Sequence, residues 1–220
     1  MRRSLSIAVA TMTLLTGCGG SVSTYHLQLD TEDPSRLTLL SLAVMRVVER
    51  RLQSVGEEIR GLDISQKEAG PELSFSVETQ AASDLLQEDL TAPFALRIMR
   101  TAKEKEIPTI EAEGHGGFVE TGVQEEHLEW VEASEERDNK GRITLAFTKD
   151  GRELMRKVFR ENVGKNIGLF VRGRLVAKLQ VDTAELKDDV IITGIPSAEL
   201  ARVFADDVNV GLYVTFTPLP

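Results

Sequence analysis

The stretch LSLAVMRVVERRLQSVG, residues 40–56, decides how we interpret the fold. Its apolar side chains recur at the spacing of one helix face, at Leu40, Val44, Val47, Val48, Leu52 and Val55. Asp33-Pro34 upstream supplies an N-cap followed by proline at the first helical position, and Gly56 ends the pattern. The opposite side of this predicted helix is charged, with Arg46, Glu49, Arg50 and Arg51. The stretch therefore predicts an amphipathic helix with one face in a core.

Strand patterns flank this helix on both sides. Tyr25, Leu27 and Leu29 alternate with polar residues before it, which is the period of a half-buried strand. After it, residues 57–64 and 72–78 predict two strands on either side of the turn Gly70-Pro71. A short helix over 81–90 and a strand over 94–99 follow. The predicted fold class is α+β, and residues 24–100 are expected to form a ferredoxin-like β-α-β-β-α-β module.

A second module is predicted over residues 123–217. Residues 101–122, charged and poor in apolar side chains, are interpreted as the linker to it. Its strands are expected at 127–136, 142–147, 166–171, 175–181, 190–195 and 210–216. Asp138-Asn139-Lys140-Gly141 and Arg172-Gly173-Arg174 predict hairpin turns. Thr148 is expected to cap a helix, and Pro196-Ser197 to open another whose Leu200, Val203 and Phe204 face inward. This module is therefore also α+β, with mostly antiparallel strands.

The composition excludes several classes of protein. The 220 residues include 26 Lys and Arg against 35 Asp and Glu, a net charge of −9, so anionic nucleic acid is not an expected partner. One cysteine cannot form an intramolecular disulfide or a cysteine-rich metal site. No apolar run reaches the roughly 20 residues of an ordinary membrane-spanning helix. Disulfide scaffolds and polytopic transporters are thereby excluded.

The first residues have the order of a secretory signal. Arg2 and Arg3 precede an apolar stretch over 5–15, which the residues Leu15-Thr16-Gly17-Cys18 then close. This ending resembles the lipobox of bacterial lipoproteins. The resemblance implies that residues 1–17 are a removed signal peptide and that Cys18 is the lipid attachment site, carrying diacylglycerol and an N-linked acyl chain such as palmitate. Residues 18–23 are then a short tether to the membrane.

Two other interpretations of this segment remain open at this point. One is a signal anchor that is not cleaved, and the other is a chance cysteine beside an ordinary cleavage site. Gly19, and not aspartate, follows the cysteine. By resemblance to sorted lipoproteins, this favours a periplasm-facing location at the outer membrane over the inner one.

A set of turns and core positions in the second module carries a further resemblance. It comprises Thr121-Gly122, residues 143–147, Asp150-Gly151, Phe159, Asn162, Gly164-Lys165-Asn166, residues 171–176, and Ile192-Thr193-Gly194 before a helix over 199–204. This set resembles the head of the large periplasmic domain of SecD, the accessory subunit of bacterial protein translocation. The first module is similar to the base of that domain through residues 47–56. The likeness covers nearly all of residues 24–207.

The SecD resemblance implies contact with an exported polypeptide or an envelope partner, without enzymatic activity. SecD itself has several transmembrane helices that carry proton-coupled work, and this sequence has none. Ala177-Lys178-Leu179 stands where that family has serine-alanine-proline, and Asn209-Val210-Gly211-Leu212 where it has glycine-alanine-leucine-proline. The generation of force is therefore not among the implied properties.

The sequence carries no pattern for a catalytic, cofactor or metal site. Of its three histidines, His26 is expected to face solvent, His115 lies in the linker near Glu111 and Glu113, and His127 shares a strand face with Glu129. None of these sets supplies the three or four ligands that a metal needs. Gly164-Lys165-Asn166 lacks the first glycine and the Ser/Thr of a phosphate-binding loop. A G-x-S-x-G motif is also absent.

Two classes of function follow. The first is a non-enzymatic envelope lipoprotein that binds a protein or an exported polypeptide. The second is a structural or assembly lipoprotein that acts as a scaffold in the envelope. The acidic run over 125–138 is expected to face away from anionic lipid. The helix with Arg152, Arg156, Lys157 and Arg160 presents either a solvated face or a surface for lipid or an acidic partner.

Overall fold

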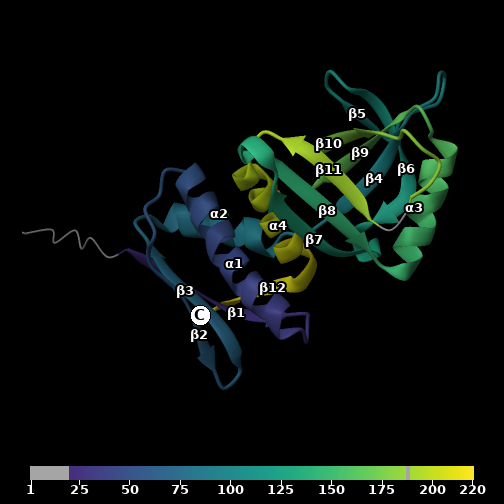
Figure 1. Ribbon diagram of the computed structural model, residues 1–220. Coiled ribbons are helices and arrows are strands. Elements are labelled where there is room, and N and C mark those ends of the chain that lie inside the picture. The colour runs from purple at the N-terminus through teal and green to yellow at the C-terminus, as the bar shows by residue number, and fades with distance from the viewer. Residues whose placement is uncertain (1–19, 187–188) are drawn as a thin grey trace, which may run out of the picture.

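The computed structural model describes residues 20–186 and 189–220, so the lipobox and Cys18 lie outside the described residues. Its helices are α1 (Pro34–Ser54), α2 (Gln80–Thr91), α3 (Lys149–Glu161) and α4 (Ala198–Tyr213). Its strands are β1 (Ser21–Leu29), β2 (Arg60–Lys67), β3 (Gly70–Val77), β4 (Leu96–Thr101), β5 (Ile110–Ala112), β6 (Gly116–Gln124), β7 (Leu128–Glu135), β8 (Gly141–Phe147), β9 (Asn166–Val171), β10 (Arg174–Gln180), β11 (Val190–Ile195) and β12 (Val214–Leu219). The α+β class predicted from the sequence is confirmed (Figure 1).

The first sheet and its helices form what we call the base module: β1, α1, β2, β3, α2 and β12. The strand order β12-β1-β3-β2, antiparallel throughout, is that of a ferredoxin-like β-α-β-β-α-β unit. Its core contains Tyr25 and Leu27 of β1, Val44 of α1, Phe75 of β3 and Phe216 of β12, all buried. The buried stripe of α1 contains Leu40, Val44, Val47, Val48 and Leu52, as the helical spacing predicted. Val55 was also expected in this stripe, but it lies at the C-cap beyond the last turn and is 51% exposed.

The last strand of this unit is not the one predicted. The strand expected over 94–99 is β4, which pairs with β6 and β9 in another sheet. Its place beside β1 is taken by β12 from the end of the chain, with Phe216 opposite Leu27. Both strands offer alternating apolar residues, so local pattern could not distinguish them. The fourth strand of the base sheet therefore comes from the end of the chain, after all the strands of the head.

The head module, comprising β4–β11 and α3, is built from two sheets. The strand orders are β10-β9-β4-β6-β5 and β11-β8-β7, and every pair is antiparallel. Residues 101–122 were predicted as a linker, but they form β5 and most of β6. Phe118 of this segment is fully buried and meets Phe170 edge to face at 5.1 Å between ring centroids. Glycines and acidic residues interrupt the alternation of apolar side chains in residues 101–122, so the sequence did not indicate these strands.

Two further predictions differ from the structure. Residues 21–23, assigned to the tether, belong to β1 and pair with β3, where Ser23 Oγ lies 2.7 Å from Ser83 Oγ of α2. Leu200, predicted to face inward on α4, is 52% exposed. The residues of α4 that face the head core are Ala201, Ala205 and Val208, with Phe204 partly buried against it. Leu200 lies on another side of the helix, whereas Phe204 and Val203 are half-buried.

Helix α4 belongs to both modules, because it packs on α1 of the base and on β7 and β8 of the head. Figure 1 shows it between the two parts. Gly141 of β8 meets α4 so closely that a Cβ would overlap the carbonyl of Ser197 and the methyl of Ala201. Buried Asn209 of α4 also donates from Nδ2 to the Val131 carbonyl of β7 at 2.7 Å and accepts from its N–H at 3.0 Å. These contacts fix the head on the base.

Candidate functional site

A hollow of the surface lies between α1 and the β2 side of the base sheet. We call it the base groove, and its volume is about 550 Å³. Its apolar lining comes from Leu29, Leu37, Met45, Ile64 and Pro71, and its polar lining from Thr38, Ser41, Asp63 and Gln66. This volume falls within the roughly 300–1,000 Å³ of typical ligand sites.

The groove is open because β2 pairs irregularly with β3 and carries few large apolar side chains. A register irregularity between Arg60 and Asp63 interrupts its pairing with β3, and Gly61 within it has φ +62°. Leu62 and Ile64, its only large apolar residues, are half-buried. The residues after Ile64 are Ser65, Gln66 and Lys67, which cannot fill apolar space under α1. On the β2 side of the sheet, the space under α1 is therefore not completely filled by side chains, although the rest of the helix packs on a buried core.

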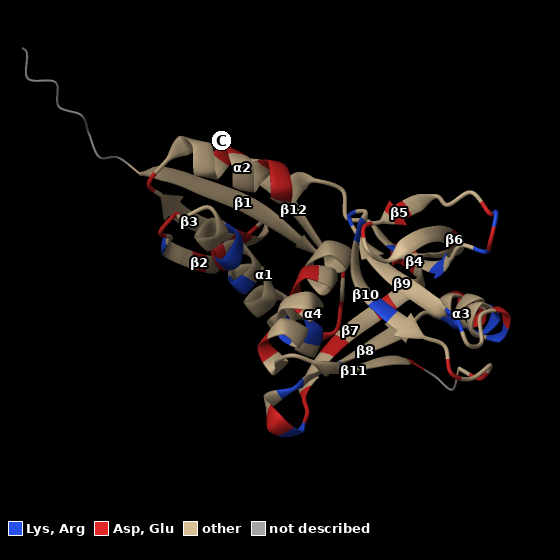
Figure 2. Ribbon diagram, turned by 90° about the horizontal axis from the view of Figure 1, so that it is seen from above, with Lys and Arg blue, Asp and Glu red and all other residues tan. Residues whose placement is uncertain are grey.

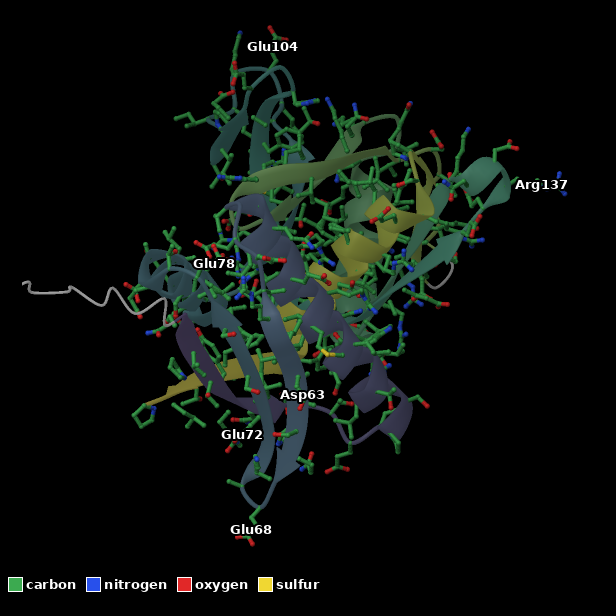
Figure 3. The ribbon with its side chains drawn as sticks, turned by 90° about the vertical axis from the view of Figure 1, so that its left-hand side faces the viewer. Asp63, Glu68, Glu72, Glu78, Glu104 and Arg137 are labelled. Atoms are coloured by element: carbon green, nitrogen blue, oxygen red, sulfur yellow. The ribbon has the colours of Figure 1, made fainter. Side chains whose placement is uncertain are left out.

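One side of β2 is also a free sheet edge. The order β12-β1-β3-β2 places β2 outermost, so within the described chain its outer backbone groups pair with no other strand. An open edge of this kind accepts an additional extended strand. Figure 3 shows the β2–β3 hairpin projecting from the base, with Glu68 at its tip and Glu104 on a head loop at the other end of the molecule. The edge is therefore accessible from solvent.

Two leucines in the N-terminal half of α1 are exposed to solvent. Leu39 is 50% exposed and Leu42 is 42% exposed. Leu42 lies one helical turn after the groove residue Thr38, on the same side of α1, whereas Leu39 follows Thr38 directly and so points about 100° away from it. Leu42 therefore extends the apolar surface at the border of the groove. The arrangement can hold an extended, partly apolar chain.

The charged face predicted for α1 is not a free surface. Arg46 donates from Nε and Nη2 to the two Asp206 oxygens of α4 at 2.8 and 2.7 Å, and Arg50 reaches Asp206 and Asp207 at 3.3 and 3.1 Å. The hydrogen bond to Asp206 raises the pKa of Arg46. Figure 2 shows the basic residues of α1 beside the acidic residues of α4. These arginines hold the two modules together.

The first turn of α1 makes a second connection to the head. Arg36 donates to Glu129 Oε1 of β7 at 3.2 Å, and its guanidinium lies 5.1 Å from the centroid of the Trp130 ring. Trp130 in turn packs against Tyr213 at the end of α4, at 5.6 Å between centroids. The Tyr213 hydroxyl donates to the Glu129 carbonyl, and burial raises its pKa. α1 thus contacts the head directly at its first turn and α4 farther along its length.

The histidines singled out in the sequence are not brought together. His26 of β1 lies beside Gly70 on the base sheet, and His115 is exposed in the β5–β6 turn. His127 was expected on a strand with Glu129, but it lies in a 3-10 turn before β7, where its Nδ1 accepts the Gln124 N–H at 3.1 Å. The described residues contain no group of three or more His, Cys, Asp or Glu that could hold a metal ion.

The groove residues were not predicted from the sequence. Leu37 and Met45 lie eight residues apart on one side of the buried stripe of α1, and this spacing is the local signal that could have indicated a second apolar surface. The other wall comes from β2 and depends on which strand lies at the sheet edge. That information is not local in the sequence.

No protein-family model and no curated protein matches the sequence. The crystal structure of SecDF from Thermus thermophilus, a translocon-associated membrane protein, is similar with a TM-score of 0.53 and 19% identity over 90% of this chain. The fold is SecDF-like. This chain spans about 30% of the length of that SecDF chain. At this identity the likeness concerns the fold alone, and it agrees with the SecD resemblance of the sequence.

Two other SecDF structures are also similar. One, of SecDF in a super-membrane-facing form, has a TM-score of 0.48 and 18% identity, covering 91% of this chain and 30% of that one. The other, described as a membrane component that enhances protein export, has a TM-score of 0.47 and 19% identity, covering 91% of this chain and 98% of that one. None of the helices in residues 20–186 and 189–220 is long and apolar enough to cross a membrane.

Proposed function

We propose that this protein is a non-enzymatic component of the bacterial cell envelope that binds an exported or unfolded polypeptide in the base groove. The observation that carries the proposal is the combination of an apolar groove of about 550 Å³ with the free edge of β2 beside it. The SecDF-like fold supports a relation to protein export.

The groove suits a polypeptide of variable sequence. Backbone N–H and C=O groups of β2 can pair with the backbone of an added strand whatever its side chains are. Alternate side chains of that strand then point to one face, where Leu37, Met45 and Ile64 offer apolar contacts. Main-chain pairing provides affinity without sequence specificity, which is what a protein acting on many exported chains requires.

The second part of the proposal is anchoring through lipid on Cys18. β1 begins at Ser21, so only Gly19 and Gly20 separate it from Cys18. Three residue steps span at most about 11 Å, which would hold the base module close to the lipid surface. We expect Cys18→Ser to release the protein from membranes or to leave it uncleaved, as seen by fractionation and intact mass. A variant that fractionates and migrates like the wild type would contradict anchoring.

A second candidate is a structural envelope scaffold with no role in translocation. The observation that favours it is the set of ion pairs between α1 and α4, which hold the two modules in one arrangement. Deletion of the gene separates the two candidates. Altered export supports the first, whereas an unchanged set of secreted proteins with impaired envelope integrity supports the scaffold.

Binding in the groove is tested with two matched leucine substitutions. Leu37→Glu places a carboxylate in the groove, whereas Leu85→Glu places one on α2 at an exposed leucine outside it. We expect Leu37→Glu to weaken binding of a permanently unfolded, labelled polypeptide about tenfold or more in fluorescence anisotropy, because a charge must then be buried. Leu85→Glu should bind like the wild type. Equal binding by all three folded proteins would contradict the proposal.

A further inference from the structure

A second cavity lies at the point where the chain passes between the modules. We call it the junction cavity, and its volume is about 250 Å³. Its walls come from Thr91–Phe94, where the chain leaves α2, and from Val210, Gly211 and Val214–Phe216, where α4 leads into β12. Arg51, at the C-terminal end of α1, and Arg172, in the β9–β10 turn, complete the lining. The base groove is formed by the opposite half of α1.

Polar groups form much of the cavity wall, and apolar residues form the rest. Leu90, Phe94, Val210 and Phe216 contribute side chains to it. The Phe94 ring lies directly on the backbone of α4 at Gly211, where a Cβ would overlap the ring. This contact fixes the shape of the cavity. Its volume is below the range for drug-sized ligands, so a fitting occupant is small.

The charges at the cavity are not balanced. Arg51 Nη1 lies 2.6 Å from Asp89 Oδ2, and Arg172 donates to Asp89 Oδ1 and, at 3.3 Å, to the Asp89 carbonyl. Two guanidinium groups therefore share one carboxylate. Burial and the neighbouring Arg172 both lower the pKa of Arg51, while Asp89 raises it. The remaining acid near Arg51, Asp207, is already paired with Arg50.

Both guanidinium groups can be reached from solvent. The side chains of Arg51 and Arg172 are 23% and 32% exposed. Each guanidinium has five N–H donors, and the contacts with Asp89 use only part of them. Arginine recognises carboxylates in particular, because two parallel N–H groups match the two oxygens.

We propose that the junction cavity binds a carboxylate carried on a small apolar group, as at the C-terminal residue of a polypeptide. The carboxylate takes the free donors of Arg51 and Arg172, and the apolar group lies against Phe94 and Phe216. This site is separate from the base groove, and it stands whether or not the groove binds a polypeptide.

The test uses the folded mature protein and a six-residue peptide that ends in leucine, prepared with a free C-terminal carboxylate and as the C-terminal amide. The free acid should bind about tenfold or more tightly than the amide in isothermal calorimetry, because the amide lacks the charge. N-acetyl-leucine serves as a third ligand. If N-acetyl-leucine binds as tightly as the free-acid peptide, the site recognises small apolar carboxylates in general. If it binds more weakly, the site prefers the ends of peptide chains. Both results support the site.

Three variants locate the binding. Arg172→Gln should weaken binding of the free acid about tenfold, whereas Asp89→Asn should strengthen it, because both arginines lose their competing carboxylate. Arg97→Gln, which removes an exposed arginine of β4 paired with Glu120, is the control and should have no effect. The proposal is overturned if acid and amide bind equally, if neither binds, or if Asp89→Asn weakens binding as Arg172→Gln does.

Discussion

Arg46 of α1 and Asp206 of α4 form a bidentate ion pair between the two modules. The two nitrogen–oxygen distances are 2.8 and 2.7 Å, and the Asp206 side chain is only 7% exposed. Because a carboxylate this buried needs partners for both oxygens, the pair fixes how α4 lies on α1. The orientation of the head therefore depends on a contact between residues 160 positions apart in the chain.

A double-mutant cycle measures this contact. We expect Arg46→Gln and Asp206→Asn to give a coupling free energy of about 1.5 kcal/mol in denaturant unfolding, a value reduced because Arg46 is 38% exposed and screened by solvent. The control is the exposed pair Arg60–Glu78, whose coupling should stay below about 0.5 kcal/mol. Equal coupling in the two cycles would contradict a role of Arg46–Asp206 in joining the modules.

Asn209 should be required for the contact between α4 and β7. Asn209→Ala removes both hydrogen bonds to Val131 and leaves a buried N–H and C=O unpaired, so we expect a loss of about 2 kcal/mol in the free energy of unfolding. The Val131 amide should also exchange with deuterium faster than in the wild type. Unchanged protection of that amide would show that Asn209 does not hold the strand.

Gly211 should tolerate no side chain while Phe94 is present. Alanine usually stabilises a helix relative to glycine, but here its Cβ would overlap the Phe94 ring. We therefore expect Gly211→Ala to lower the free energy of unfolding by about 2 kcal/mol. In a Phe94→Ala background the same substitution should cost nothing or stabilise. A similar loss in both backgrounds would mean that the ring is not the cause.

The ion pair between Arg100 and Glu106, in the loop after β4, should persist at acidic pH. The hydrogen bond from Arg100 and then the Lys103 backbone N–H lower the pKa of Glu106 to about 2, from 4.5. Because the folded pKa is depressed, the stabilisation is present above pH 4.5 and is lost only as the pH falls through about 2. A carboxyl-carbon NMR titration should show this midpoint, and Arg100→Gln should raise it. A midpoint near 4.5 in the wild type would disprove the contact.

Local sequence patterns predicted most of the base module. The alternation of Tyr25 and Leu27 and the stripe from Leu40 to Leu52 lie buried as expected, because each pattern reports directly on one face of one element. Pairing between distant segments was not predictable in this way. β4 and β12 have similar patterns, and only the three-dimensional structure shows that Phe216 lies opposite Leu27.

The same reason explains the missed site. Charges on α1 indicated a polar face but not that Arg46 and Arg50 pair with Asp206, which lies far along the chain. The base groove depends on β2 being an edge strand, and the junction cavity on the return of α4 beside Phe94. Residues that act through tertiary contacts leave little local signal. The lipid attachment at Cys18, which is a purely local motif, stays a prediction of the sequence.

Amide hydrogen exchange of β2 tests the central claim most directly. The backbone N–H groups on the outer edge of Arg60–Lys67 should exchange more slowly when an unfolded polypeptide is added, since they acquire partners in an added strand. The amides of β10, at the edge of the head sheet, provide the comparison and should be unchanged. Protection at β2 alone would support polypeptide capture in the base groove. Bound polypeptide with no protection at β2 would contradict it.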